Sequence, residues 1–152
     1  MNLDNIKEIA LLASLEGGKV LKDYYGKKLE IKYKGEIDLV TEADYLSEHA
    51  ITKIIKENFP DHQIYAEEKK DYTDKNSSFI WFIDPLDGTT NFAHGLPIFC
   101  ISIALEFKGE IIFGLIYDPI REETFLALTK KLESRKLKSL IKASLLLDFL
   151  MI

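Results

Sequence analysis

The residues with the clearest chemical meaning lie in one short segment, Asp84-Pro85-Leu86-Asp87-Gly88-Thr89-Thr90-Asn91-Phe92. Two carboxylates stand three residues apart on either side of a proline, directly after an apolar run. Pro85 restricts the local backbone, and Gly88 permits a tight turn, so we expect both carboxylates to project from the end of a strand. The amides that follow would open a helix, whose N-terminus binds anions.

Carboxylates beside an anion site indicate a divalent cation held between the protein and a phosphate. Hard oxygen ligands favour Mg²⁺, and no set of His and Cys residues competes for that role. Glu67 and Glu68 follow a predicted strand and supply further carboxylates. Asp44 is expected to pair with the Thr89 hydroxyl and orient a water molecule.

Other interpretations of this segment are a solvated, Asp-rich surface turn and two known motifs. Haloacid-dehalogenase-type phosphatases place their two aspartates two residues apart, whereas Asp84 and Asp87 are three apart. An EF-hand loop needs oxygen ligands at alternate positions and a bidentate Glu, which this segment lacks. The apolar run before the segment and the Gly-Thr-Thr-Asn after it favour a ligand site over a plain turn.

The elements that must position these residues can be predicted from hydrophobic periodicity. Apolar residues at helical spacing predict helices over residues 4–25 and 41–58, the second capped by Thr41. Extended patterns predict strands over residues 29–34, 63–66, 79–83, 98–107, 110–117 and 124–128, with Lys108-Gly109 as a hairpin turn. The strand over 79–83 is expected to end abruptly at Asp84-Pro85. Helices first and strands afterwards predict an α+β fold, with two N-terminal helices packed on a largely antiparallel sheet.

Composition bounds the class of protein. The 152 residues are enough for one domain, 47% are hydrophobic, and no apolar run is long enough to span a bilayer. A formal net charge of −5 argues against nucleic acid as a partner, and a lone cysteine, Cys100, is consistent with a cytoplasmic protein. Cys100 and Trp81 are expected to be core residues, His62 an ordinary turn residue, and His94 a polar loop residue near the site.

The last residues have a different character from the rest. Residues 130–152 carry six Lys or Arg against two acidic residues, and the chain finishes in an apolar run. Natural termini are usually polar. We therefore expect residues 1–129 to form the N-terminal part of a domain, and residues 130–152 to be an atypical tail that is truncated or out of frame.

Taken together, four segments resemble the Mg²⁺-dependent inositol monophosphatases and their fructose-1,6-bisphosphatase-like relatives. The segments are residues 38–44, 67–68, 81–92 and 114–119, and they occur in the order and spacing of that family. The resemblance implies part of an αβαβα layered sugar-phosphatase sandwich. It also implies hydrolysis of a phosphate monoester, nominally inositol monophosphate, by water that paired metal ions activate.

The resemblance further implies a role for each matching residue. Glu67, Asp84 and the Leu86 carbonyl would hold one Mg²⁺, and Asp84 would bridge to a second Mg²⁺ that Asp87 also binds. Catalysis would use Asp44 and Thr89, together with Glu67, to activate the attacking water. The substrate phosphate would lie against residues 86–89 (Leu86, Asp87, Gly88 and Thr89), held by the amides of Gly88 and Thr89.

Two departures from the family pattern limit these expectations. Ala66 stands where a glycine is usual, and no Trp-Asp-x-Ala-Ala-Gly motif, whose Asp would complete the second metal site, is present. The alternative is therefore a catalytically impaired or non-catalytic fragment. If the chain is active, a fructose-1,6-bisphosphatase or a 3′-nucleotide phosphatase stays open as well. Expected partners are a small phosphate monoester and a second copy of the chain in a homodimer, with neither nucleic acid nor membrane.

Overall fold

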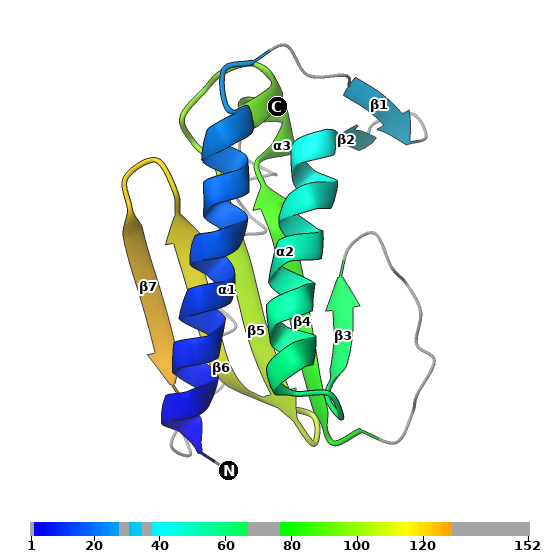
Figure 1. Ribbon diagram of the computed structural model, residues 1–152, viewed down its shortest axis with the longest axis vertical. Coiled ribbons are helices and arrows are strands. Elements are labelled where there is room, and N and C mark those ends of the chain that lie inside the picture. The colour runs from blue at the N-terminus through cyan, green and yellow to red at the C-terminus, as the bar shows by residue number, and fades with distance from the viewer. Residues whose placement is uncertain (1, 28–30, 35–37, 67–76, 129–152) are drawn as a thin grey trace.

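The computed structural model describes residues 2–27, 31–34, 38–66 and 77–128. Two helices lie side by side on one face of a five-stranded sheet, and a separate two-stranded hairpin lies at one end (Figure 1). In chain order the elements are α1 (Leu3–Tyr24), β1 (Ile31–Lys34), β2 (Asp38–Thr41), α2 (Glu42–Asn58), β3 (Gln63–Ala66), β4 (Phe79–Asp87), α3 (Thr89–Ala93), β5 (Cys100–Phe107), β6 (Glu110–Asp118) and β7 (Glu123–Leu128).

The sheet has the order β3-β4-β5-β6-β7, in which β3 is parallel to β4 and all other neighbours are antiparallel. The predicted hairpin between β5 and β6 is confirmed. Lys108 (φ 51°) and Gly109 (φ 85°) both have positive φ, as a two-residue hairpin turn with the twist of the flanking strands requires. The α+β class with a largely antiparallel sheet is therefore confirmed.

The two long helices form where their apolar periodicity predicts them. The side chain of Asn2 caps α1 by accepting hydrogen bonds from the amides of Asp4 and Asn5, at 3.1 and 3.3 Å. Each helix buries one stripe against the sheet and against the other helix. The buried residues are Ile6, Ala10, Ala13, Ser14, Gly17, Gly18 and Leu21 in α1, and Ala43, Asp44, Ser47, Glu48, Ile51 and Ile55 in α2.

Two adjacent glycines let α1 approach its neighbours closely. A Cβ atom at Gly17 would lie 2.8 Å from the side chain of Ile51, and one at Gly18 would lie 2.4 Å from the ring of Tyr117. Any side chain at these positions would force the elements apart. The pair that weakens the intrinsic propensity of the helix is therefore what permits its packing.

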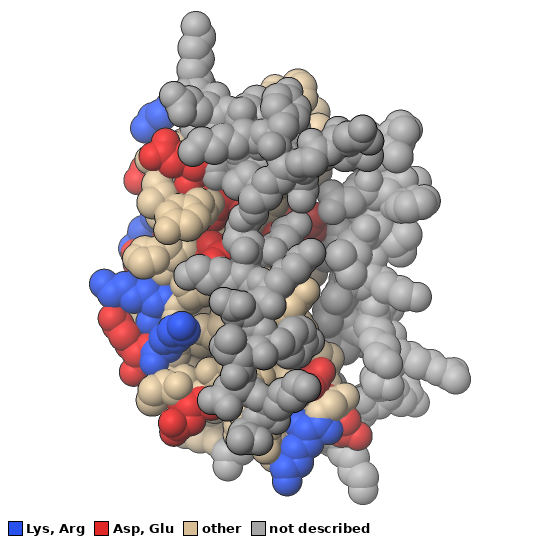
Figure 2. All heavy atoms as spheres, turned by 90° about the vertical axis from the view of Figure 1, so that its right-hand side faces the viewer, with Lys and Arg blue, Asp and Glu red and all other residues tan. Residues whose placement is uncertain are grey.

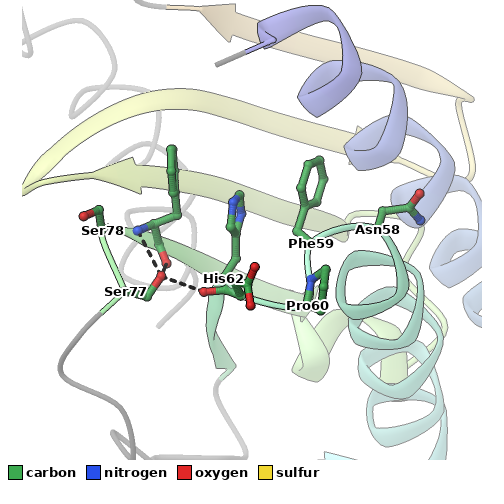
Figure 3. Close-up of a pocket in the computed structure, with 8 residues that line it drawn as sticks. Asn58, Phe59, Pro60, His62, Ser77 and Ser78 are labelled. Atoms are coloured by element: carbon green, nitrogen blue, oxygen red, sulfur yellow. Dashed lines mark hydrogen bonds between the residues drawn. The ribbon is translucent and has the colours of Figure 1, made fainter.

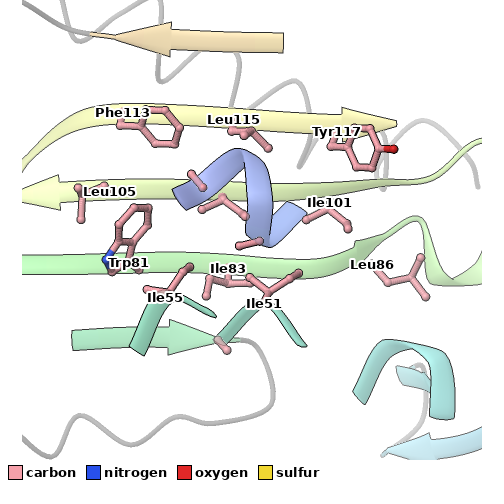
Figure 4. Packing of buried hydrophobic residues seen from close by; sticks show 14 of the residues in the cluster. Ile51, Ile55, Trp81, Ile83, Leu86, Ile101, Leu105, Phe113, Leu115 and Tyr117 are labelled. Carbon is pink, nitrogen blue, oxygen red and sulfur yellow. The ribbon is translucent and has the colours of Figure 1, made fainter. Parts of the chain in front are cut away.

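The apolar core lies between the two helices and the sheet (Figure 4). Trp81, Ile83, Ile101, Leu105 and Phe113 point from the strands toward the helices. Trp81 is fully buried, as expected. A run that is apolar at every position, such as Phe79–Ile83, is typical of a strand covered on both faces. Phe82 is nevertheless only half-buried, because successive strand residues point to opposite faces and Phe82 lies on the face away from the helices.

Two expectations about strand limits are wrong. The fourth strand continues through Pro85 to Asp87 instead of ending at Asp84, and a register shift between Asp84 and Asp87 accommodates the proline. The predicted strands leave out residues 38–41, yet these residues form β2, which pairs antiparallel with β1. The sequence predicted the strand at β1 but no partner for it, and β2 is that partner.

Candidate metal and phosphate site

The site begins at the end of β4, where the strand carries an irregularity. Asp84 pairs with Ser102 and Asp87 with Cys100, so three steps along β4 match two steps along β5. In a regular strand, residues three apart point to opposite faces. The extra residue resets this alternation, and since Ser102 and Cys100 are two apart, the register places Asp84 and Asp87 on the same face of the sheet.

Hydrogen bonds restrain the oxygen atoms of residues 84–89, which are called the loop below although the first four of them belong to β4. The Leu86 amide donates to Oδ1 of Asp84 at 3.2 Å, and the Thr89 hydroxyl donates to the Leu86 carbonyl at 2.9 Å. Asp87 is 6% exposed, and its Oδ2 accepts a long hydrogen bond from the Cys100 thiol at 3.7 Å. The loop therefore offers two carboxylates and one backbone carbonyl, all hard oxygen donors, within four residues of the sequence.

Gly88 makes the turn from β4 into α3, as predicted. Its φ of +91° lies in the left-handed region, and a Cβ atom there would lie 2.9 Å from the carbonyl oxygen of Ile98. The carbonyl of Gly88 accepts from the Phe92 amide at 3.0 Å, and α3 begins at Thr89. Only glycine satisfies both the backbone conformation and the close approach of the residue 98 backbone.

Packing fixes α3 against the end of α1. The Tyr25 hydroxyl donates to the Gly95 carbonyl at 2.7 Å, and the Tyr25 ring lies 5.8 Å from the ring of Phe92 and 5.3 Å from that of Phe99. Phe92 and Phe99 make an edge contact at 4.8 Å. His94 is exposed beside this cluster, as the sequence predicted, with Nδ1 2.8 Å from the Thr90 carbonyl.

Asp44 lies in the first turn of α2 and is 6% exposed. One turn further along, the Ser47 hydroxyl donates to the Pro85 carbonyl at 3.1 Å. This hydrogen bond ties the start of α2 to the loop that carries Asp84 and Asp87. The expected pairing of Asp44 with Thr89 stays a prediction, since the hydrogen bond seen for the Thr89 hydroxyl runs to Leu86.

Most of the predicted site residues thus belong to one loop, and Asp44 lies in α2. Glu67, Glu68 and the predicted tail lie outside the described residues. The strand before Glu67 ends at Ala66, which pairs with Ile83 directly before Asp84. Within the described ranges, no three His, Cys, Asp or Glu side chains are close enough together to hold a metal ion. The donor types present nevertheless fit Mg²⁺, which takes oxygen ligands and keeps several waters.

The sequence predicted no role for Ser47, and it predicted Cys100 to be a core residue, whereas Cys100 is only half-buried. Both contact the loop, and neither contact was predictable, because each depends on the register shift at Pro85. His62 was expected to be an ordinary turn residue. Instead its ring is stacked between those of Phe59 and Phe79, at 4.7 and 4.4 Å.

A hollow of about 470 Å³ lies at the other end of the sheet (Figure 3). It is lined by residues 58–62 and 77–79, and Ser77 closes one side through hydrogen bonds to the backbone of Asp61 and Phe79. Since it lies where α2 ends and β4 begins, it is separate from the loop at the end of β4.

On the side of the molecule shown in Figure 2, acidic and basic side chains are interspersed over the coloured part.

Comparison with known proteins identifies the family. The model of the inositol monophosphatase family matches residues 2–140, and the chain belongs to that family. It is 45% identical over 121 residues to "Nus factor SuhB" of Pasteurella multocida and 46% identical over 123 residues to "Inositol-1-monophosphatase" of Synechocystis. These matches cover 78% and 80% of this chain but 45% and 43% of the relatives, so the chain spans less than half of their length.

The fold agrees with that assignment. The crystal structure of the extragenic suppressor protein suhB from Bartonella henselae superimposes with a TM-score of 0.79 at 36% identity. The match covers 83% of this chain and 50% of that one.

No helix among the described residues is long and apolar enough to cross a membrane.

Proposed function

We propose that the loop Asp84–Thr89 binds Mg²⁺ and a phosphate group, and that the chain takes part in Mg²⁺-dependent hydrolysis of a phosphate monoester. The nominal substrate is inositol monophosphate, which would yield inositol and phosphate. The observation that carries this proposal is the register shift at Pro85, because it turns Asp84 and Asp87 to the same side of the sheet. Membership of the inositol monophosphatase family supports the phosphatase class.

Metal binding, phosphate binding and activation of the attacking water are assigned to different residues according to their chemistry. Asp84, Asp87 and the Leu86 carbonyl, together with Glu67, would hold the metal. When bound, Mg²⁺ polarises a phosphoryl oxygen and lowers the pKa of a coordinated water. Amides of Gly88 and Thr89 would orient the phosphate against residues 86–89, since α3 begins there. Asp44 and the Thr89 hydroxyl, with Glu67, would position the attacking water and accept its proton.

The alternative is a chain that binds Mg²⁺ but turns over substrate poorly or not at all. It is favoured by one observation, that these 152 residues contain no Trp-Asp-x-Ala-Ala-Gly motif, whose Asp would complete the second metal site by the family resemblance. Paired-metal catalysis depends on close placement of every ligand, so a missing ligand would reduce the rate strongly. Fructose-1,6-bisphosphate and nucleotide 3′-phosphates are the other candidate substrates to be tested.

The experiment is a phosphate-release assay on the 152-residue chain with inositol monophosphate, fructose-1,6-bisphosphate and a nucleotide 3′-phosphate, each with millimolar Mg²⁺ and with EDTA. Turnover that requires Mg²⁺ and is lost in Asp84→Asn supports the enzyme. Mg²⁺ binding without turnover of any substrate supports the alternative. Turnover that persists in EDTA contradicts the proposed mechanism.

A further inference from the structure

The carbonyl group of Pro85 lies at a point where the regular hydrogen bonding of the sheet is interrupted. The β4–β5 register passes from Asp84 to Asp87 and omits Pro85 and Leu86. Pro85 is buried and, as a proline, has no amide hydrogen of its own. A buried carbonyl needs a donor to offset its loss of hydration. Here the Ser47 hydroxyl is such a donor, at 3.1 Å.

The surroundings of Ser47 exclude a substitute donor from solvent. Ser47 is fully buried. The backbone of α1 lies directly against it, since a Cβ atom at Gly17 would be 2.9 Å from the Ser47 hydroxyl oxygen. Water therefore has no route to the Pro85 carbonyl along this side, and loss of the hydroxyl would leave that carbonyl without the donor it has now.

Ser47 also connects two parts of the candidate site. Residues three apart on a helix lie on the same face, so Ser47 follows Asp44 by one turn on the side of α2 that meets the loop. The residue it bonds, Pro85, is flanked by Asp84 and lies two residues before Asp87. The bond joins segments 38 residues apart and fixes the start of α2 relative to both carboxylates.

We infer that Ser47 is a positioning residue: by holding the Pro85 carbonyl, it sets the placement of the Asp84 and Asp87 carboxylates relative to Asp44. The effect of Ser47 on metal binding rests on the proposed function. Its effect on the loop does not, because the hydrogen bond constrains the backbone whether or not a metal is bound.

The test compares Ser47→Ala with a matched control, Ser14→Ala, in the full chain. Ser14 is also fully buried, and its hydroxyl donates to the Leu11 carbonyl at 2.9 Å within α1, away from the loop. Each variant loses one buried hydroxyl and one hydrogen bond to a backbone carbonyl. The readout is native-state hydrogen exchange of the amides of Leu86 and Phe92, referenced to the amide of Ile103 in β5.

We expect Ser47→Ala to accelerate exchange of the two loop amides by roughly tenfold relative to Ile103, and Ser14→Ala to leave that ratio unchanged. Equal effects of the two variants on the ratio would overturn the inference. If Ser47→Ala does not fold, Ser47→Cys is compared with Ser14→Ala instead, because its side chain is similar in size to serine but its thiol is a weaker hydrogen-bond donor. Its loop amides must then exchange faster than those of Ser14→Ala, or the inference is wrong.

Calorimetric titration with Mg²⁺ separates this inference from the proposed function. If the unsubstituted chain binds Mg²⁺, Ser47→Ala should weaken the affinity and Ser14→Ala should not. If the unsubstituted chain binds no Mg²⁺, the proposed function fails, while the exchange experiment still decides the role of Ser47 in the loop.

Discussion

The indole Nε1–H of Trp81 donates to Nδ1 of His62 at 3.0 Å, which joins the buried centre of β4 to the turn before β3. Because Nδ1 accepts this hydrogen bond, the neutral imidazole carries its proton on Nε2. The ring is stacked between Phe59 and Phe79 with interplanar angles of 11° and 14°. A protonated ring would have two donors and would lose the bond to Trp81.

Acid should therefore destabilise the fold through His62. Burial lowers the pKa of His62 below its ordinary value of 6.5, opposed by the nearby charge of Asp61. The unfolded chain then binds the proton more tightly than the folded chain does, so the free energy of unfolding is highest above pH 6.5 and falls as the pH drops below it. Urea unfolding between pH 5 and pH 8, followed by the emission of Trp81, the single tryptophan, measures this slope.

The variant His62→Asn provides the control for that prediction. An asparagine amide oxygen can take the place of Nδ1 as acceptor, but it does not titrate in this range. The dependence of unfolding free energy on pH between 5 and 7 should become shallower in this variant. An unchanged slope would show that His62 is not the group responsible.

Gly88→Ala should destabilise the protein more than alanine at another glycine of positive φ. Gly95 has a φ of +74° with open space around it, so Gly95→Ala measures the backbone cost alone, about 1–2 kcal/mol. Gly88→Ala adds the contact at 2.9 Å with the Ile98 carbonyl and should cost about 1–3 kcal/mol more. Urea unfolding of both variants checks this, and equal costs would contradict the close approach of the loop to residue 98.

Gly17→Ala should also destabilise, against the intrinsic preference of a helix. In an exposed helix the change would stabilise by about 1 kcal/mol. Here the new methyl group would lie 2.8 Å from Ile51, and we expect a net loss of about 1–3 kcal/mol. In the background of Ile51→Ala, the same change should cost less, because the two Ile51 atoms at 2.8 Å are gone and only the Ser47 hydroxyl oxygen, at 2.9 Å, still crowds the new methyl group. A cost that is the same in both backgrounds would mean that Ile51 is not what limits the space.

Much of the fold could be predicted from the sequence because local patterns and packing agree there. The two helices form where apolar residues recur at helical spacing. The β5–β6 hairpin forms around the predicted turn at Lys108-Gly109. The loop at Asp84–Thr89 was identified because proline, glycine and paired carboxylates each restrict the backbone or the chemistry in a recognisable way.

What could not be predicted depends on contacts between distant segments. The extension of β4 past Pro85 needs the partner strand β5, whose register shift has no local signal. The bond from Ser47 to Pro85 and that from Trp81 to His62 each join different elements. Serine on a helix and histidine in a turn are common in ordinary surface positions, so their types alone did not reveal these roles.

The most direct test of the central claim is calorimetric titration of the 152-residue chain with Mg²⁺, beside Asp84→Asn, Asp87→Asn and Asp61→Asn. Asp61 is an exposed aspartate beside the hollow at the opposite end of the sheet, so its variant controls for the loss of one charge. We predict that the unsubstituted chain and Asp61→Asn bind Mg²⁺ alike, while either loop variant weakens binding at least roughly tenfold. Equal affinities for all four proteins, or no binding by the unsubstituted chain, would contradict a magnesium site at Asp84 and Asp87.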